Sequence, residues 1–358
     1  MSRTQTLRER MAREGVNALL VTRPENRLYL SGFSGSAGAL LVFPDAAYLL
    51  TDFRYLEQAQ EQSPDFTVVK ADREYHGTVS ELMGKHAATT LGFEKDHVTF
   101  GMYQMFKDKL PGVELVGVSG WVEQLRRVKD PGEIEKIARA QSLVDQGFGQ
   151  LLEWMAAGMS EEEVALELEC MLRRLGARRM AFEIIVVSGP RASLPHGQPT
   201  GRRLGAGDLV TIDVGVTLDG YCCDMTRTVV VGAAGAEEQR IYNVVLRAQE
   251  AALEAIKPGL TGVQVDAVAR DIIGQAGLGE RFGHGLGHGV GLAVHEGPGL
   301  SPLAPADVVL EAGNVVTVEP GVYIPGWGGV RIEDLVVVTA GGCRNLTASP
   351  KHLIAVRA

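Results

Sequence analysis

LVTIDVGVTLDGYCCDMTRTVVV, residues 209–231, consists of two apolar, β-branched runs joined by Asp219-Gly220. An Asp-Gly pair between two such runs is a strong signal for a β-hairpin, because both central residues of its two-residue turn need a positive φ. Counting back from this turn pairs Leu218 with Tyr221. The stretch therefore predicts an antiparallel hairpin whose register is set by the turn.

Two aspartates lie within these apolar strands. The same register pairs Asp213 with Thr226, so that Asp213 and Asp224 become diagonal neighbours on one face, roughly 7 Å apart. A solvent-exposed face is the alternative, but Ile212 and Val214 occupy the opposite face. Two carboxylates among apolar residues are costly to bury without a partner. The pattern favours a shared cation.

Further acidic residues occur at strand ends. NVVTVEPGVY (314–323) predicts a strand with Glu319 at its end, just before Pro-Gly. GVRIEDLVVV (329–338) predicts another strand, which carries Glu333 and Asp334 on opposite faces. Periodicity alone leaves open which of these two acids faces a site.

Histidines gather in HGLGHGVGLAVHEG (284–297), which contains His284, His288 and His295 among glycines that let the backbone approach a ligand. His196 stands in SLPHG before the hairpin. A single histidine is usually structural, but three within twelve residues, together with the carboxylates, favour a functional role. The spacing is not the HExxH pattern of helical zinc proteases.

Taken together, four carboxylates and one imidazole in the chain are of the types that bind a pair of divalent metals. A set of oxygen and nitrogen ligands suits manganese, cobalt or zinc better than a set of thiolates would. The five residues are Asp213, Asp224, His288, Glu319 and Glu333. Two such metals can make a nucleophile from water at neutral pH and clamp a hydrolysed bond. The sequence therefore predicts a dinuclear metal centre.

Domain organisation follows from the periodicity. About the first 125 residues alternate helical and strand patterns, which predicts an α/β domain with a mixed sheet. We expect strands at 17–22, 39–43, 47–52, 66–70 and 113–118, and helices at 4–14, 53–62, 75–86 and 101–110. Asp130-Pro131 is an N-cap followed by proline at the first helical position, which opens a long helix. We place the domains at 1–128 and 129–358.

An internal repeat is visible in the second domain. Ser160 matches Thr261 and Glu163 matches Gln264, and each pair is a capping box that opens a helix ending at glycine. The repeat predicts two related halves, with ligands converging between them.

Bulk properties narrow the partners and the location. The 358 residues are 45% apolar and 22% charged, with a formal net charge of -9 and no long Lys/Arg run. This argues against nucleic acid and anionic membranes as partners. The four cysteines form no CxxC pair, the N-terminus has no apolar core, and no apolar run is long enough to span a membrane. We expect a cytoplasmic protein.

These motifs resemble a known family. HGxP at 196–199, DxGxxxxGYxxDxTRT at 213–228, the histidine stretch at 283–298, TVEPGxY at 317–323 and GVRIED at 329–334 are similar to the pita-bread metallopeptidases, in the branch of aminopeptidase P and prolidase. The resemblance covers about residues 130–350 strongly and the N-terminal domain weakly. It implies an α+β chain in which a pita-bread catalytic domain with an internal pseudo-two-fold repeat follows the α/β domain.

The resemblance also implies roles. A hydroxide between two metals, manganese first, would attack the carbonyl of a Xaa-Pro bond, with Glu319 as proton shuttle. Asp213 would hold one metal, Asp224 and Glu333 would bridge both, and His288 and Glu319 would complete the second. His196 and His295 would steady the developing oxyanion and the peptide carbonyls, His284 would line the proline pocket, Arg331 would fix Glu333, and Tyr323 would support substrate binding.

Alternatives within and outside this branch stay open. Small bacterial aminopeptidases P, which cleave the N-terminal residue from Xaa-Pro peptides, are favoured over Xaa-Pro dipeptidases. A methionine aminopeptidase, or a metal-free binding module or creatine-amidinohydrolase-like enzyme on the same fold, is weaker. The family also implies a homodimer.

Overall fold

The computed structural model describes residues 2–71 and 74–358, which form two compact units, Met1–Arg126 and Arg127–Ala358. The first unit is built on a six-stranded mixed sheet of order β4-β3-β2-β1-β5-β6. Its elements are α1 (Arg3–Arg13), β1 (Ala18–Val21), α2 (Pro24–Ser31), β2 (Ala39–Val42), β3 (Ala47–Thr51), α3 (Leu56–Gln62), β4 (Thr67–Lys70), α4 (His76–Lys85), β5 (Thr90–Glu94), α5 (Phe100–Lys109), β6 (Glu114–Val118) and α6 (Trp121–Arg127).

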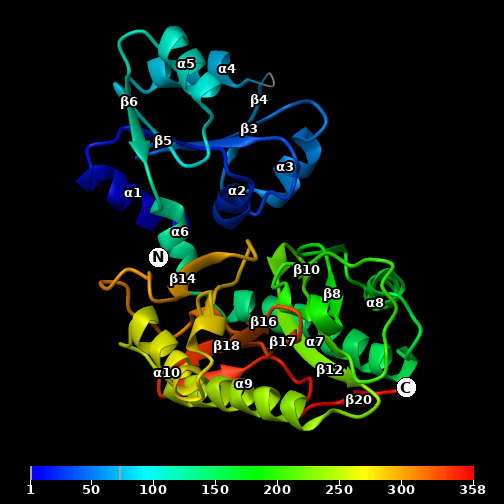
Figure 1. Cartoon of the computed structure of the whole chain (residues 1–358). Helices are drawn as coiled ribbons and strands as arrows, with labels where there is room; N and C mark the ends of the chain where they lie inside the picture. Colours follow the sequence, from blue (N-terminus) through cyan, green and yellow to red (C-terminus); the bar gives the residue numbers. More distant parts are fainter. Residues whose placement is uncertain (1, 72–73) are drawn as a thin grey trace. The chain divides into compact units, whose positions relative to one another are not determined.

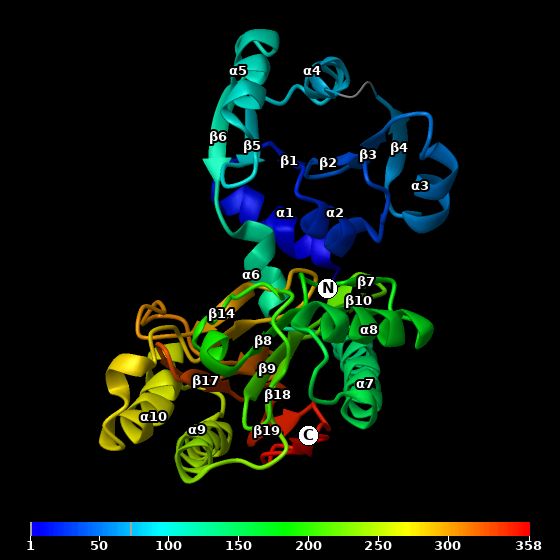
Figure 2. The same ribbon diagram turned by 45° about the vertical axis from the view of Figure 1, so that its right-hand side comes forward.

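Helices cover both faces of this sheet, with α1 and α2 on one side and α4 on the other (Figure 2). Leu20, Leu41 and Leu50 join Val79 and Leu82 of α4 in one buried cluster. The mixed sheet and the predicted strands and helices are confirmed, with ends that differ by a few residues.

Three elements of the first unit, α2, β5 and α6, were not expected. Helix α2 buries the polar Asn26 and Arg27, so it shows no apolar stripe at helical spacing. Strand β5 has Gly92 at its centre, which weakens a strand pattern.

The second unit consists of two halves, each of which is a pair of helices followed by strands (Figure 1). Its first half contains α7 (Pro131–Trp154), α8 (Glu161–Arg174), β7 (Arg179–Met180), β8 (Ile185–Ser188), the 3-10 turn η1 (Gly189–Ser193), β9 (Leu209–Val214), β10 (Val216–Leu218), β11 (Tyr221–Cys222) and β12 (Met225–Val231). Its second half contains α9 (Ala236–Ala255), α10 (Gly262–Gln275), η2 (Gly279–Arg281), β13 (Gly287–Gly289), β14 (Glu296–Leu300), β15 (Val315–Val318), β16 (Gly321–Ile324), β17 (Gly328–Arg331), β18 (Asp334–Thr339), β19 (Gly342–Asn345) and β20 (Ala355–Val356).

The two halves begin in the same way. Both predicted capping boxes form, with the Ser160 and Thr261 hydroxyls accepting bonds from the backbone of the residue three positions on. Each N-cap also makes an isolated antiparallel bridge, Ser160 to Arg203 and Thr261 to Val309. The repeat seen in the sequence is therefore present in the fold.

The predicted hairpin register is confirmed. Leu218 lies opposite Tyr221, and Asp213 lies opposite Thr226. Asp219 and Gly220 have φ of 50° and 85°, as the two-residue turn requires. The pairing is interrupted at Gly215 and at residues 223–224, so Asp224 lies between strands.

The expected single strand at 329–338 is wrong. It divides into β17, which pairs with β16, and β18, which pairs with β15 in another sheet. Ile332 and Glu333 connect the two.

Among the described residues, none of the helices has the length and apolar character needed to cross a bilayer.

Candidate metal centre

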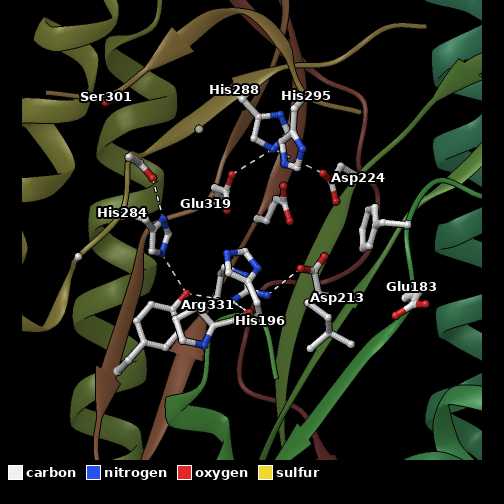
Figure 3. Close-up of a pocket in the computed structure, with 18 of the residues that line it drawn as sticks. Glu183, His196, Asp213, Asp224, His284, His288, His295, Ser301, Glu319 and Arg331 are labelled. Atoms are coloured by element: carbon white, nitrogen blue, oxygen red, sulfur yellow. Dashed lines mark hydrogen bonds and ion pairs between the residues drawn. The ribbon is translucent and has the colours of Figure 1, made fainter. Parts of the chain in front are cut away.

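The five predicted metal ligands meet in one cavity of about 880 Å³ in the second unit (Figure 3). They come from separate elements, and most stand at or beside a strand end. Asp213 is in β9, Asp224 lies between β11 and β12, His288 is in β13, Glu319 directly follows β15, and Glu333 directly precedes β18.

The ligand atoms are close enough to share cations. His288 Nε2 lies 3.6 Å from Asp224 Oδ2 and 3.4 Å from Glu319 Oε1. One ligand atom from each of Asp224, His288 and Glu333 lies within 4.8 Å of the others. Asp224 and Glu333 are almost fully buried, at 5% and 2% exposure.

Two threonine hydroxyls support these acids. Thr226 donates to Glu333 Oε2 at 2.7 Å, and Thr317 donates to Glu319 Oε1 at 3.1 Å. The Thr317 hydroxyl also accepts from the backbone N–H of His288. Neither threonine was expected to support the site, although the sequence contained a signal for both. Thr226 is two residues after Asp224 and Thr317 two before Glu319, the spacing that places side chains on one face of a strand.

Arg331 has a different partner from the one expected. Its Nη2 donates to Asp213 Oδ2 at 2.7 Å, and its Nε donates to the Thr226 hydroxyl at 2.9 Å. The prediction that Arg331 fixes Glu333 directly is wrong, because β17 ends at Arg331 and the strand alternation does not continue to Glu333. The hydrogen bonds of the guanidinium connect it to Glu333 through the Thr226 hydroxyl.

The choice between Glu333 and Asp334 is also resolved. Glu333 lines the cavity, whereas Asp334 is buried away from it. Asp334 Oδ1 lies 2.8 Å from Arg227 Nη2, and its other oxygen lies 3.0 Å from Lys351 Nζ. Burial acts to raise the pKa of Asp334, but Arg227 and Lys351 hold it below its ordinary value.

Crowding of buried acids shifts their proton affinities. Burial, reinforced by neighbouring carboxylates, raises the pKa of Asp224 and of Glu333 well above their ordinary values. Burial, opposed by Arg331 and reinforced by Asp213, raises the pKa of Glu319 to about 8. Burial, reinforced by His295, lowers the pKa of His288 to about 4, which keeps its imidazole neutral.

The wall beside these acids is made of hydrogen-bonding side chains. His284 Nε2 lies 3.0 Å from the Tyr323 hydroxyl, which accepts a bond from Arg331 Nη1 at 2.9 Å. The hydroxyl therefore donates to Nε2, while Nδ1 of the imidazole donates to the Gly285 carbonyl at 2.8 Å. Burial lowers the pKa of His284 to about 4. A neutral imidazole of fixed tautomer results.

The remaining predicted residues, His196 and His295, also line the cavity. The His295 ring lies edge-on to the His288 ring with centroids 4.2 Å apart. Burial lowers the pKa of His295. The structure thus brings all ten predicted site residues to one cavity, while their chemical roles stay predictions.

The residues present fit a pair of divalent cations. Five carboxylates line the cavity, four of them in the predicted metal set, with only Arg331 as a permanently charged cation. Asp213 Oδ1 is buried and has no hydrogen-bond partner in the described part of the chain. A buried carboxylate oxygen without a partner is costly, and a metal ion would satisfy it.

Comparison with known proteins agrees with this geometry. Residues 135–340 match Metallopeptidase family M24, and residues 3–128 match the Creatinase/Prolidase N-terminal domain. The chain belongs to metallopeptidase family M24. In this M24 chain, an N-terminal α/β domain is followed along the sequence by a domain with the family's pita-bread fold.

Three relatives illustrate the similarity of this M24 peptidase to others. An Xaa-Pro dipeptidase from Pyrococcus furiosus is 38% identical over 353 residues, 98% of this chain and 99% of that protein. The solved structure of an Xaa-Pro dipeptidase from Bacillus anthracis matches with a TM-score of 0.96 and 42% identity over 99% of both chains. That of an X-Pro aminopeptidase from Thermotoga maritima MSB8 has a TM-score of 0.90 and 38% identity, over 99% of this chain and 100% of that one.

Several cavity residues of this M24 peptidase were not expected from the sequence. Phe182, Glu183 and Ile185 are close in sequence and line the cavity together, and Gln198 and Ser301 line it as well. No fixed motif position marks them: Gln198 is the variable residue of the HGxP stretch, and the others are ordinary residue types in a strand or loop.

The raised carboxyl pKa values predict how the metal-free peptidase responds to pH. Glu319, with a pKa of about 8, keeps its proton when folded at a pH where the unfolded chain has lost it. The folded state then binds more protons, so its free energy of unfolding falls as pH rises from 6.5 to 8, by up to about 2 kcal/mol for this group alone. The lowered pKa values of His284 and His288 make the free energy of unfolding rise with pH, but only below about pH 6.5.

Urea unfolding of chelator-treated protein across that pH range measures this effect. Glu319→Gln should reduce the slope of the free energy of unfolding against pH by the equivalent of about one proton. The metal-loaded protein should not lose stability over this range, because metal binding strengthens as protons leave the ligands. A metal-free protein whose stability rises over this range would contradict the prediction.

Proposed function

We propose that the chain is a dinuclear-metal Xaa-Pro dipeptidase. The observation that supports this most directly is the cluster of four buried or half-buried carboxylates and one neutral imidazole beside a wall of histidine, tyrosine and arginine. The dipeptidase preference is supported by the Bacillus anthracis and Pyrococcus furiosus relatives, which bear that name. They favour dipeptidase activity over the aminopeptidase P activity expected from the sequence.

Asp213, Asp224, His288, Glu319 and Glu333 would hold the two metals. When bound, the metal ions supply a nucleophile at neutral pH and polarise the carbonyl oxygen of the scissile bond. Manganese is our first choice, with cobalt or zinc as alternatives, because oxygen-rich sites accept several ions.

Glu319 is the proposed proton carrier. Its Oε1 accepts from Thr317 and faces His288, so Oε2 is the oxygen left to take a proton from water and deliver it to the prolyl nitrogen. His196 and His295 would donate hydrogen bonds to the peptide carbonyl as it gains negative charge. His284 and Tyr323 would line the space for proline, and Arg331 would hold Asp213 in place.

Substrate length and metal dependence test this proposal together. The metal-loaded protein should hydrolyse Ala-Pro with a higher kcat/KM than Ala-Pro-Ala, and chelation should abolish both activities. Faster hydrolysis of Ala-Pro-Ala would instead support aminopeptidase P, the second candidate, which the Thermotoga maritima relative favours. Cleavage of Met-Ala-Ser in preference to both would indicate a methionine aminopeptidase.

Metal analysis of the purified protein separates these enzymes from a metal-free module on the same fold. Full activity after chelation would contradict the metal centre. The domain borders at 1–128 and 129–358, the homodimer and the cytoplasmic location stay predictions, of which the homodimer is checked by light scattering.

A further inference from the structure

Glu183 is the one carboxylate of the cavity that does not belong to the proposed metal set. Its side chain is exposed, and it makes no hydrogen bond or ion pair with any residue that the structure describes. The other four acids of the cavity are buried or half-buried and face the metal centre. An unpaired charge at the mouth of a cavity is available to a ligand.

The segment that carries Glu183 is held firmly to the strand that carries Asp213. Ala181 N donates to the Gly215 carbonyl at 2.8 Å, and Ile185 lies opposite Asp213 in the β8–β9 ladder. The Phe182 ring packs on Gly215 so closely that an added Cβ there would lie 2.7 Å from Cε1. Glu183 therefore has a fixed place relative to the metal ligands.

A second groove, of about 570 Å³, adjoins the cavity at this wall. The two share Phe182, Glu183 and Gln198, of which only Glu183 is charged. Leu166 of α8, 65% exposed, also lines the groove. The groove's cation Arg173 is paired with Glu169 at 2.8 Å.

Arg179, the other cation of the groove, does not line the main cavity. A side chain that passes from the cavity toward the groove has the apolar Phe182 and Ile185 beside it, and Glu183 is the one charged residue that lines both spaces.

The charges of the cavity also set the direction of a substrate. Figure 3 places Glu183 beyond Asp213 and on the opposite side of the cavity from His284. An Xaa-Pro dipeptide is a zwitterion. Its proline carboxylate suits the side of the hydrogen-bond donors Arg331 and His196, and its N-terminal residue then lies toward Phe182 and Glu183. The α-ammonium stays near the buried acids, and only a long side chain reaches the exposed Glu183.

We propose that Phe182, Ile185 and Glu183 form the subsite for the side chain of the N-terminal residue and that Glu183 selects lysine or arginine there. This rests on the proposed Xaa-Pro hydrolysis. The apolar walls cover the methylene stem, as they do where long cationic side chains lie along apolar surface, and the carboxylate pairs with the charged head.

Matched dipeptides test the selection. kcat/KM is measured for Arg-Pro, Met-Pro and Glu-Pro, since Met offers a long unbranched side chain without charge. The wild type should prefer Arg-Pro, and Glu183→Gln should reduce the Arg-Pro to Met-Pro ratio roughly three- to tenfold, as expected for a partly solvated ion pair. Glu183→Lys should shift the preference to Glu-Pro. Added salt should weaken the wild-type preference.

Glu162→Gln is the matched control, because Glu162 is an exposed acid on α8 that lines neither the cavity nor the groove. It should keep the wild-type ratios. The proposed subsite is overturned if Glu183→Gln lowers kcat/KM equally for all three substrates. Glu183 would then bind the α-ammonium group or act only as part of the wall. The subsite is equally overturned if the wild type prefers Glu-Pro, which would assign the selection to Arg179. Failure of the wild type to hydrolyse any of the three would overturn the proposed function itself.

Discussion

Glu333→Gln is expected to reduce kcat/KM by more than about 100-fold, beyond the 10- to 100-fold typical of residues that only support a metal ligand. It should also lower the number of divalent cations that stay bound after gel filtration. The physical reason is that an amide carries no negative charge, while the carboxylate lies within 4.8 Å of the ligand atoms of Asp224 and His288. Metal content and kcat/KM measured on the same preparation check this.

The metal-free form of that variant should be as stable as the wild type or more stable. Burial and the neighbouring carboxylates raise the pKa of Glu333, so the ionised form is already disfavoured without metal. Glutamine resembles the protonated acid, and its carbonyl oxygen can still accept from Thr226. A large loss of stability in the metal-free variant would mean that Glu333 acts in folding and not in metal binding.

Asp334→Asn is the matched control, one residue away. It breaks a buried pair with Arg227, and removing one partner of such a pair costs about 3–5 kcal/mol in the free energy of unfolding. Because Asp334 does not line the cavity, the folded variant should keep its metal. Equal metal loss in both variants would contradict the assignment of Glu333 alone to the centre.

These two neighbours also show where sequence reasoning ends. Their alternation places them on opposite faces of a strand but cannot say which face meets the centre. The chain in fact leaves one sheet after Arg331 and enters another at Asp334, so the period of two does not apply across Glu333. Strand breaks of this kind depend on which distant strands pair, and a single sequence does not carry that information.

The register of the hairpin could be predicted because it depends on residues that are close in sequence. Asp219-Gly220 sets the turn, the turn sets the pairing, and the pairing places Asp213 opposite Thr226. The capping boxes at Ser160 and Thr261 are local in the same sense.

The partner of Arg331 and the position of Glu183 depend on contacts between segments far apart in the chain. Only the geometry reveals them. The residue types that can bind metal were therefore predictable, and the network that orients them was not.

Arg331 is expected to have the second-largest effect on activity. Arg331→Met should lower metal affinity and kcat/KM by about 10- to 100-fold, because the side chain joins Asp213, Thr226 and Tyr323 at once. Arg331→Lys should recover little of this, since one ammonium cannot reproduce the planar fork of a guanidinium that serves three oxygens. Metal titration followed by steady-state kinetics measures both variants.

The pH dependence of metal binding separates an electrostatic role of Arg331 from a purely structural one. Without its positive charge, the carboxylates of the centre hold their protons more tightly, so binding a cation displaces more protons at neutral pH. The apparent metal affinity of Arg331→Met should therefore rise more steeply with pH than that of the wild type. Tyr323→Phe removes only the hydroxyl between Arg331 and His284 and should leave that slope unchanged. A parallel slope in Arg331→Met would show that the guanidinium acts as a spacer between strands and does not balance the charge of the acids.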